Sequence, residues 1–124
     1  MNKRILVIDD DIYMRELYEE VLESAGYEVE TAIDGEDGIV KLKSGGFQLT
    51  LLDMMMPKID GIGVLNEISK NPSVIKNGPV ILLSNLGQEH VVEEAMKKGA
   101  VSYLVKADIT PDQLLKSVEK YLGK

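Results

Sequence analysis

Short apolar runs alternate with longer amphipathic segments along the whole chain. Four of the runs are almost entirely apolar, and a fifth alternates between polar and apolar residues as a half-exposed strand does. Near-continuous apolar strands are typical of a parallel sheet that is covered on both faces. The five predicted strands are residues 5–8, 27–32, 49–52, 80–83 and 101–105, of which 27–32 is the alternating one.

The segments between these strands carry the marks of helices. Apolar residues at helical spacing form one face of the first helix: Met14, Leu17, Val21, Leu22 and Ala25. Capping and breaking residues mark the helix ends: Gly26 after the first, Asp34 before the second, Asn71 and Pro72 after the third, Gly99 after the fourth, and Thr110 and Pro111 at the start of the fifth.

The pair of strand and helix occurs five times, without a linker or a low-complexity segment. Because parallel crossovers are right-handed, this order predicts an open, doubly wound α/β sheet with helices on both faces. Ligands of such sheets bind at the carboxyl ends of the strands. The chemistry is therefore expected at residues that end or directly follow the predicted strands.

Polar residues that are distant in sequence collect at that edge. Asp9 and Asp10 end the first strand, whereas the third, fourth and fifth strands end at Asp53, Ser84 and Lys106. Clustered carboxylates repel each other unless a cation is supplied, and Lys106 offsets only one charge. Mg²⁺ prefers oxygen ligands and suits a site where some of its coordination positions stay open for water and phosphate. Because a carboxylate beside Mg²⁺ and a lysine can attack phosphorus, these residues predict an aspartyl-phosphate site.

Composition and charge narrow the classes of function. The 124 residues fit one domain, and the absence of cysteine excludes disulfides and thiolate chemistry. The single histidine, His90, argues against a histidine metal site and is interpreted as a surface residue. No apolar run approaches the roughly 20 residues that span a membrane, so a cytoplasmic location is expected. The net charge of −7 argues against direct binding of nucleic acid.

Four segments match motifs of one known family: LVIDDD at residues 6–11, LLDMMMPKIDG at 51–61, VILLSN at 80–85 and GAVSYLVKAD at 99–108. Each match is weak alone, but the set, with each member at a strand end, is highly specific. Over its whole length the chain resembles the receiver domain of bacterial two-component response regulators, of the stand-alone, chemotaxis-regulator-like kind. The resemblance implies a flavodoxin-like fold with strand order 2-1-3-4-5, five flanking helices and a single receiver domain over residues 1–124.

The resemblance also implies a phosphorylation and metal site. Asp53 would be the catalytic phosphoacceptor and a ligand of Mg²⁺, the one cofactor implied. Asp10 would bind the ion directly and Asp9 mostly through water. The backbone carbonyl of Met55 would be a further ligand, so that at this position the main chain matters more than the side chain.

A switch is implied by the same resemblance. Lys106 would contact the phosphoryl group, the hydroxyl of Ser84 would move toward it, and the ring of Tyr103 would turn inward. Phosphorylation adds about −1.5 to −2 charges at one point, which is enough to bias a two-state loop.

The implied partners are proteins. A sensor histidine kinase or histidine phosphotransfer protein would donate the phosphoryl group, with the first helix as its contact through Met14, Arg15 and Tyr18. The protein would catalyse only its own phosphorylation and slow dephosphorylation, and it would be a monomer when unphosphorylated. A downstream target would contact a surface formed by residues 89–98, 102–105 and 110–122.

Four positions distinguish this chain from the common pattern of the family. Ala107 replaces the usual cis-proline, and a trans bond from Lys106 to Ala107 is expected because a non-proline cis bond costs about 2.5–4 kcal/mol. Asn85 stands where a small residue is common, and its amide either narrows the approach or donates a hydrogen bond to phosphate. Met55 and Leu86 are apolar and cannot orient a water, so slow self-dephosphorylation is expected.

Two local interpretations complete the prediction. Asp11 is expected to cap the first helix rather than to bind metal. Of the three consecutive methionines, Met56 is expected to pack in the core, whereas Met54 and Met55 are expected to fill the loop.

Other classes of function fit the residues less well. A phosphohydrolase with an aspartyl-phosphate intermediate usually has a second Asp two residues after the nucleophile, where this chain has Met55. A flavodoxin-like nucleotide-binding module needs a Ser/Thr/Gly-rich loop after the first strand, where this chain has three aspartates. A receiver-like scaffold that is never phosphorylated stays open, as do the kinase, the target, the pathway and whether the chain belongs to a longer regulator.

Overall fold

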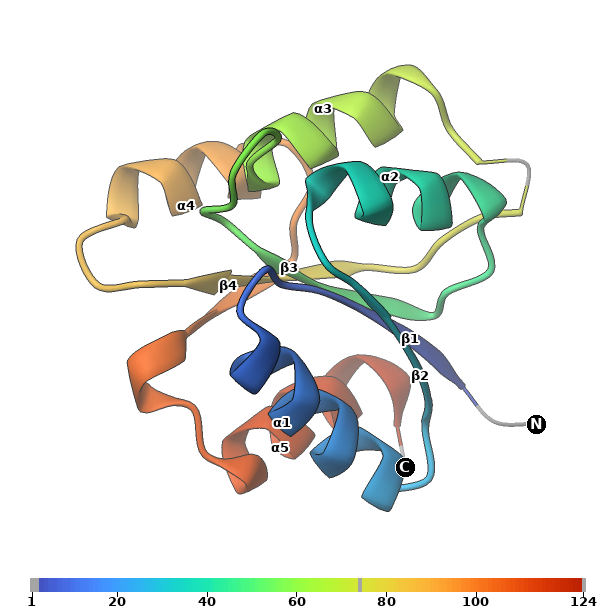
Figure 1. Ribbon diagram of the computed structural model, residues 1–124, viewed down its shortest axis with the longest axis vertical. Helices are drawn as coiled ribbons and strands as arrows, with labels where there is room; N and C mark the ends of the chain where they lie inside the picture. Colours follow the sequence, from blue (N-terminus) through green and yellow to red (C-terminus); the bar gives the residue numbers. More distant parts are fainter. Residues whose placement is uncertain (1–2, 74, 124) are drawn as a thin grey trace.

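The computed structural model describes residues 3–73 and 75–123 and contains one five-stranded parallel sheet (Figure 1). Its strand order is β2-β1-β3-β4-β5, which confirms the predicted doubly wound topology. In register, Ile8 lies beside Leu52 and Asp53 beside Leu83, so the carboxyl ends of the central strands meet at one edge. The strands are β1 (Arg4–Ile8), β2 (Glu28–Ala32), β3 (Leu49–Asp53), β4 (Val80–Ser84) and β5 (Ser102–Val105).

The helices cover both faces of the sheet. They are α1 (Ile12–Ser24), α2 (Gly35–Ser44), α3 (Gly61–Lys70), α4 (Glu89–Lys97) and α5 (Pro111–Leu122), with a short 3-10 helix, η1 (Lys106–Asp108), after β5. Figure 1 shows α1 and α5 on one face and α2, α3 and α4 on the other. The side chains of Asp11, Asp34 and Thr110 accept hydrogen bonds from the first turns of α1, α2 and α5, as their sequence positions predict.

Strands β1, β3 and β4 supply the buried apolar side chains at the centre of the core. Their side chains alternate between two apolar clusters, one under α1 and α5 and one under α2, α3 and α4. Every residue of β3 and β4 is buried. Because burying one large aliphatic side chain stabilises by about 1.5–3 kcal/mol, these central strands are held firmly and fix the positions of the residues at their ends.

The inward face of α1 differs from the predicted one. Tyr18 is fully buried, whereas Leu17 is 41% exposed. Met14, Tyr18 and Leu22 are spaced four residues apart, so they form one stripe along the helix and Leu17 lies beside it. The expectation that Tyr18 contacts a kinase is therefore wrong, because its side chain is inside the protein.

Met54 is a second correction, since it is fully buried and not a loop-filling residue. Its backbone N–H donates to the carbonyl of Leu83 and its carbonyl accepts from Gly61, so the chain keeps its course beside β4 for one more residue. A side chain at Gly61 would meet the Met54 sulfur at 3.0 Å, which shows how closely the start of α3 packs over it. Met56 is buried, as predicted.

The edge strand β5 is only half-buried and begins one residue later than predicted. Its Tyr103 is 50% exposed. Within the described residues every peptide bond is trans, which confirms the expectation for Lys106 and Ala107. No helix in the described part of the chain is long and apolar enough to cross a membrane.

Candidate functional site

Three carboxylates meet where β1 and β3 end side by side. Asp53 is the last residue of β3, and Asp9 and Asp10 follow β1. Asp9 and Asp53 are buried, with exposed fractions of 0% and 2%, whereas Asp10 is exposed. One oxygen from each carboxylate lies within 4.8 Å of the others. We call these three residues the acid cluster.

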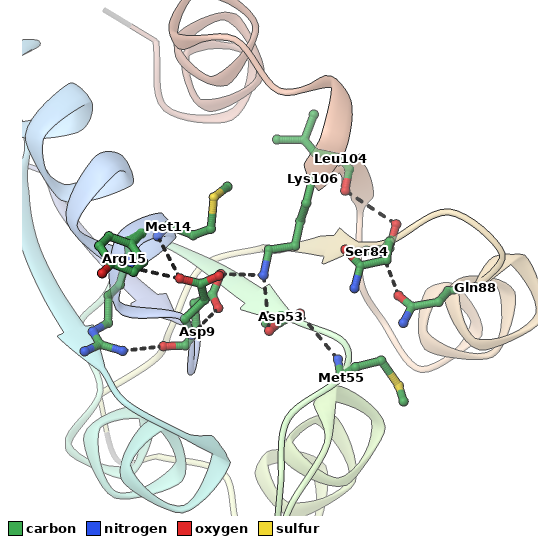
Figure 2. Close-up of polar contacts among 12 residues, drawn as sticks. Asp9, Met14, Arg15, Asp53, Met55, Ser84, Gln88, Leu104 and Lys106 are labelled. Carbon is green, nitrogen blue, oxygen red and sulfur yellow. Dashed lines mark hydrogen bonds and ion pairs between the residues drawn. The ribbon is translucent and has the colours of Figure 1, made fainter.

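The loop between β1 and α1 is fastened at several points around Asp9. The Asp9 N–H donates to the carbonyl of Ala32 at 3.2 Å, and its Oδ1 accepts from the N–H of Asp11 at 2.9 Å. The guanidinium of Arg15 donates to the Asp9 carbonyl at 2.8 Å (Figure 2). These bonds fix the main chain of the loop and one oxygen of Asp9, and they leave Asp9 Oδ2 free to face Lys106.

Lys106 supplies the positive charge. It lies at the start of η1, and its Nζ is 2.9 Å from Asp9 Oδ2 and 3.4 Å from Asp53 Oδ2 (Figure 2). Burial acts to lower the pKa of Lys106, but the two carboxylates outweigh it, so that the pKa is raised above its ordinary value. The lysine is therefore protonated at neutral pH and supplies one positive charge to the site.

One lysine does not neutralise the acid cluster. Burial first, and then repulsion from Asp9, raise the pKa of Asp53 from 3.8 to about 7, although Lys106 and the N–H of Met55 act in the opposite direction. The Met55 N–H donates to Asp53 Oδ1 at 3.3 Å. A carboxylate that is held so close to protonation at neutral pH is stabilised by a further cation.

The donor set fits a divalent metal ion. Asp9, Asp10 and Asp53 offer only oxygen ligands and carry more negative charge than Lys106 offsets, which are properties that favour Mg²⁺. An open cleft of about 460 Å³ lies against the cluster and leaves room for water and phosphate. Its walls are formed by Asp10, Asp11, Met14, Asp53, Met55, Asn85, Lys106 and Ala107.

The two residues expected to form the switch lie apart from the acid cluster. Ser84 is buried at the end of β4, and its hydroxyl donates to the carbonyl of Leu104 at 3.5 Å, not to Asp53 (Figure 2). A groove of about 270 Å³ separates β5 from α4 and is lined by residues that include Ser84, Tyr103 and Val92. With the Tyr103 ring half-exposed, this groove is open.

Sequence reasoning missed the structural roles of two residues near the site. Arg15 was expected only as a kinase contact, although its place four residues after Asp11 lets it reach back to the loop. Gln88 was not singled out, yet its side chain accepts a hydrogen bond from the Asn85 N–H at 2.8 Å. Its position directly before α4 is the one signal that could have identified it, since side chains at such positions often bond to nearby main chain.

Comparison with known sequences agrees with this geometry. Residues 5–119 match the response regulator receiver domain. The chain is 42% identical over 106 residues to the chemotaxis protein CheY of Treponema pallidum, covering 83% of this chain and 72% of that protein. It is 33% identical over 121 residues to the chemotaxis protein CheY of Thermotoga maritima, covering 97% and 98%. The probable transcriptional regulator ycf27 of Cyanophora paradoxa is 38% identical over 122 residues, which is 98% of this chain but 49% of that protein.

Solved structures show the same likeness. A CheY-like receiver domain protein from Methanospirillum hungatei has a TM-score of 0.87 at 28% identity, with 98% of this chain and 94% of that chain covered. The chemotaxis protein CheY4 of Vibrio cholerae has a TM-score of 0.81 at 27% identity, with 98% and 99% covered. The chain therefore belongs to the response regulator receiver domains, which are signalling modules of two-component systems and not classical enzymes.

Proposed function

We propose that this protein is a phosphoacceptor signalling module in which Asp53 receives a phosphoryl group from a phosphohistidine. The observation that carries the proposal is the placement of Asp53. It is a buried carboxylate between a second buried carboxylate, Asp9, and the ammonium of Lys106, and it borders an open cleft. A merely structural aspartate has no reason to bear this cost of burial.

The proposed reaction uses these residues as follows. A carboxylate oxygen of Asp53 attacks phosphorus, a P–O bond forms, and the P–N bond to the histidine of the donor breaks with its electron pair left on the imidazole. Lys106 stays beside the reacting oxygens and balances their charge. Bound by Asp9, Asp10, Asp53 and the Met55 carbonyl, Mg²⁺ would neutralise charge on the phosphoryl oxygens.

The output belongs to the same proposal. The Ser84 hydroxyl, whose bond to Leu104 is long at 3.5 Å, leaves that partner for the new phosphoryl oxygens. Tyr103 then has an open groove beside it to enter. The altered surface of α4, β5 and α5 is the proposed contact for a downstream protein, with α1 and the loops around the acid cluster as the contact for a histidine kinase or phosphotransfer protein.

The proposal extends to the organisation of the protein. Residues 1–124 act as one receiver domain, and the protein catalyses only its own phosphorylation and a slow dephosphorylation. The cytoplasmic location and the monomeric unphosphorylated state remain predictions from the sequence.

Intact-protein mass spectrometry after incubation with acetyl phosphate tests the proposal. A single phosphoryl adduct is expected with Mg²⁺, none with EDTA, and none in the Asp53→Asn variant. An Asp108→Asn variant, which changes an exposed aspartate outside the cleft, serves as the matched control and is expected to behave as the unaltered protein. A folded protein that forms no adduct and does not bind beryllofluoride would favour a receiver-like scaffold instead.

A further inference from the structure

The side chain of Gln88 ties down the loop between β4 and α4. Gln88 is the residue before α4 and does not cap that helix with its side chain. Instead its Oε1 accepts a hydrogen bond from the backbone N–H of Asn85 at 2.8 Å (Figure 2). Gly87 lets the chain turn back between them with a φ of +87°, a conformation that other residues seldom adopt. The four-residue loop, residues 85–88, is thus closed by a hydrogen bond of ordinary length.

Asn85 occupies a boundary between two cavities. It lines the cleft with Asp53 and Lys106, and it also lines the groove with Ser84 and Gln88. A change at the acid cluster that moves Asn85 therefore also alters the shape of the groove beside α4. The hydrogen bond from Asn85 to Gln88 resists such a movement.

A phosphoryl group on Asp53 would compete for the Asn85 N–H. It carries about −1.5 to −2 charges on three strong acceptor oxygens, and a charged acceptor binds an N–H more strongly than a neutral amide oxygen does. Asn85 directly follows Ser84 in the chain and is one of the residues that line the cleft. Its N–H already donates a hydrogen bond to Gln88. By contrast, the Ser84 hydroxyl is held only by a 3.5 Å contact.

We propose that Gln88 is a positioning residue that holds the β4–α4 loop in its unphosphorylated arrangement, by occupying the Asn85 N–H until a phosphoryl group displaces it. This inference rests on the proposed phosphorylation of Asp53. If so, the strength of the hydrogen bond accepted by Gln88 determines how readily phosphorylation rearranges the β4–α4 loop. Gln88 touches neither the carboxylates nor Lys106, so the metal site should not depend on it.

Three variants test the proposal in the full chain. Gln88→Met keeps the length of the side chain but cannot accept the hydrogen bond, whereas Gln88→Glu keeps an acceptor oxygen. Gln113→Met is the matched control, because Gln113 is an exposed glutamine in the first turn of α5. Isothermal titration calorimetry measures the affinity for beryllofluoride with Mg²⁺ and for Mg²⁺ alone, and the amide NMR signal of Asn85 reports its hydrogen bond.

Gln88→Met is expected to bind beryllofluoride about two- to tenfold more tightly, which is the gain when one ordinary hydrogen bond no longer has to break. Its Asn85 amide signal should shift before any ligand is added, and its affinity for Mg²⁺ alone should stay unchanged. In Gln88→Glu the Asn85 amide signal should return to its position in the unaltered protein, and the increase in affinity for beryllofluoride should disappear. Gln113→Met should match the unaltered protein in both measurements.

Two outcomes would overturn the inference, and each differs from a failure of the proposed function. If the unaltered protein binds beryllofluoride and Gln88→Met binds it no more tightly than Gln113→Met does, Gln88 merely stabilises the loop. If Gln88→Met changes the affinity for Mg²⁺ alone by the same factor, it acts on the acid cluster and not on the loop. Absence of beryllofluoride binding by the unaltered protein overturns the proposed phosphorylation and, with it, the role of Gln88.

Discussion

Replacement of Asp53 by asparagine should stabilise the metal-free protein. The carboxylate is buried beside the buried carboxylate of Asp9, and both burial and this repulsion raise its pKa from 3.8 to about 7. Asparagine keeps the shape and removes the charge. It does not leave Lys106 without a partner, because the lysine Nζ remains 2.9 Å from Asp9 Oδ2.

The sign and size of the effect follow from the pKa. A carboxyl group whose pKa is raised by folding destabilises the folded state wherever the unfolded chain is ionised. The penalty is absent well below pH 3.8, grows as the pH rises from there toward 7, and is constant above pH 7. With each pKa unit worth on the order of 1.4 kcal/mol, the penalty is roughly 2 kcal/mol at pH 5 and roughly 4 kcal/mol at pH 8.

Urea unfolding followed by circular dichroism in EDTA measures this difference. The buried amide of asparagine has a cost of its own, but it does not titrate. The gain in the free energy of unfolding of Asp53→Asn over the unaltered protein should therefore be larger at pH 8 than at pH 5, by roughly 2–3 kcal/mol. The exposed Asp108→Asn control should show no such dependence. Added Mg²⁺ should reduce the difference in the free energy of unfolding between Asp53→Asn and the unaltered protein, because it binds the unaltered protein and stabilises it.

A gain that is equal at pH 5 and pH 8 would refute the reasoning, since it would mean that Asp53 is ionised in the folded protein without penalty. A loss of stability in Asp53→Asn at pH 8 would refute it as well. That result would show that the pair with Lys106, at 3.4 Å, outweighs burial and the repulsion from Asp9.

Further predictions concern four other positions. Tyr18→Phe should raise the free energy of unfolding by about 1–2 kcal/mol in urea, because the Tyr18 hydroxyl is buried without a hydrogen-bond partner among the described residues; a decrease would show that the hydroxyl is satisfied. Lys106→Met should lower it by about 3–5 kcal/mol at pH 8, because two buried carboxylates lose their cation; an unchanged urea midpoint would contradict this. Met55→Asn and Leu86→Glu should each shorten the lifetime of the phosphorylated protein, followed by mass spectrometry after removal of acetyl phosphate, because each places a polar group where a water can be oriented. Unchanged lifetimes in both variants would remove the explanation for slow dephosphorylation.

Local patterns in the sequence determined the architecture. Apolar runs of four or five residues, separated by amphipathic segments, are sufficient to predict five parallel strands with helices on both faces. The caps at Asp11, Asp34 and Thr110 could also be predicted, because an N-cap bond joins residues two or three apart in sequence. The gathering of Asp9, Asp53 and Lys106 followed from topology alone, since the carboxyl ends of parallel strands share one edge.

Only the tertiary structure decided how those residues are held and what lies beneath them. Periodicity gives the face of a helix but not which of two neighbouring stripes is pressed against the sheet, so the burial of Tyr18 was missed. The charge balance at Asp53 depends on distances to Asp9 and Lys106 and on the exclusion of water, which arise only when the strands pack. The bond from Asn85 to Gln88 depends on a backbone turn and a side-chain rotamer. Interactions between residues that are close in sequence can be predicted from the sequence. The desolvation of a side chain and the direction in which it points are set by the packing of the complete fold.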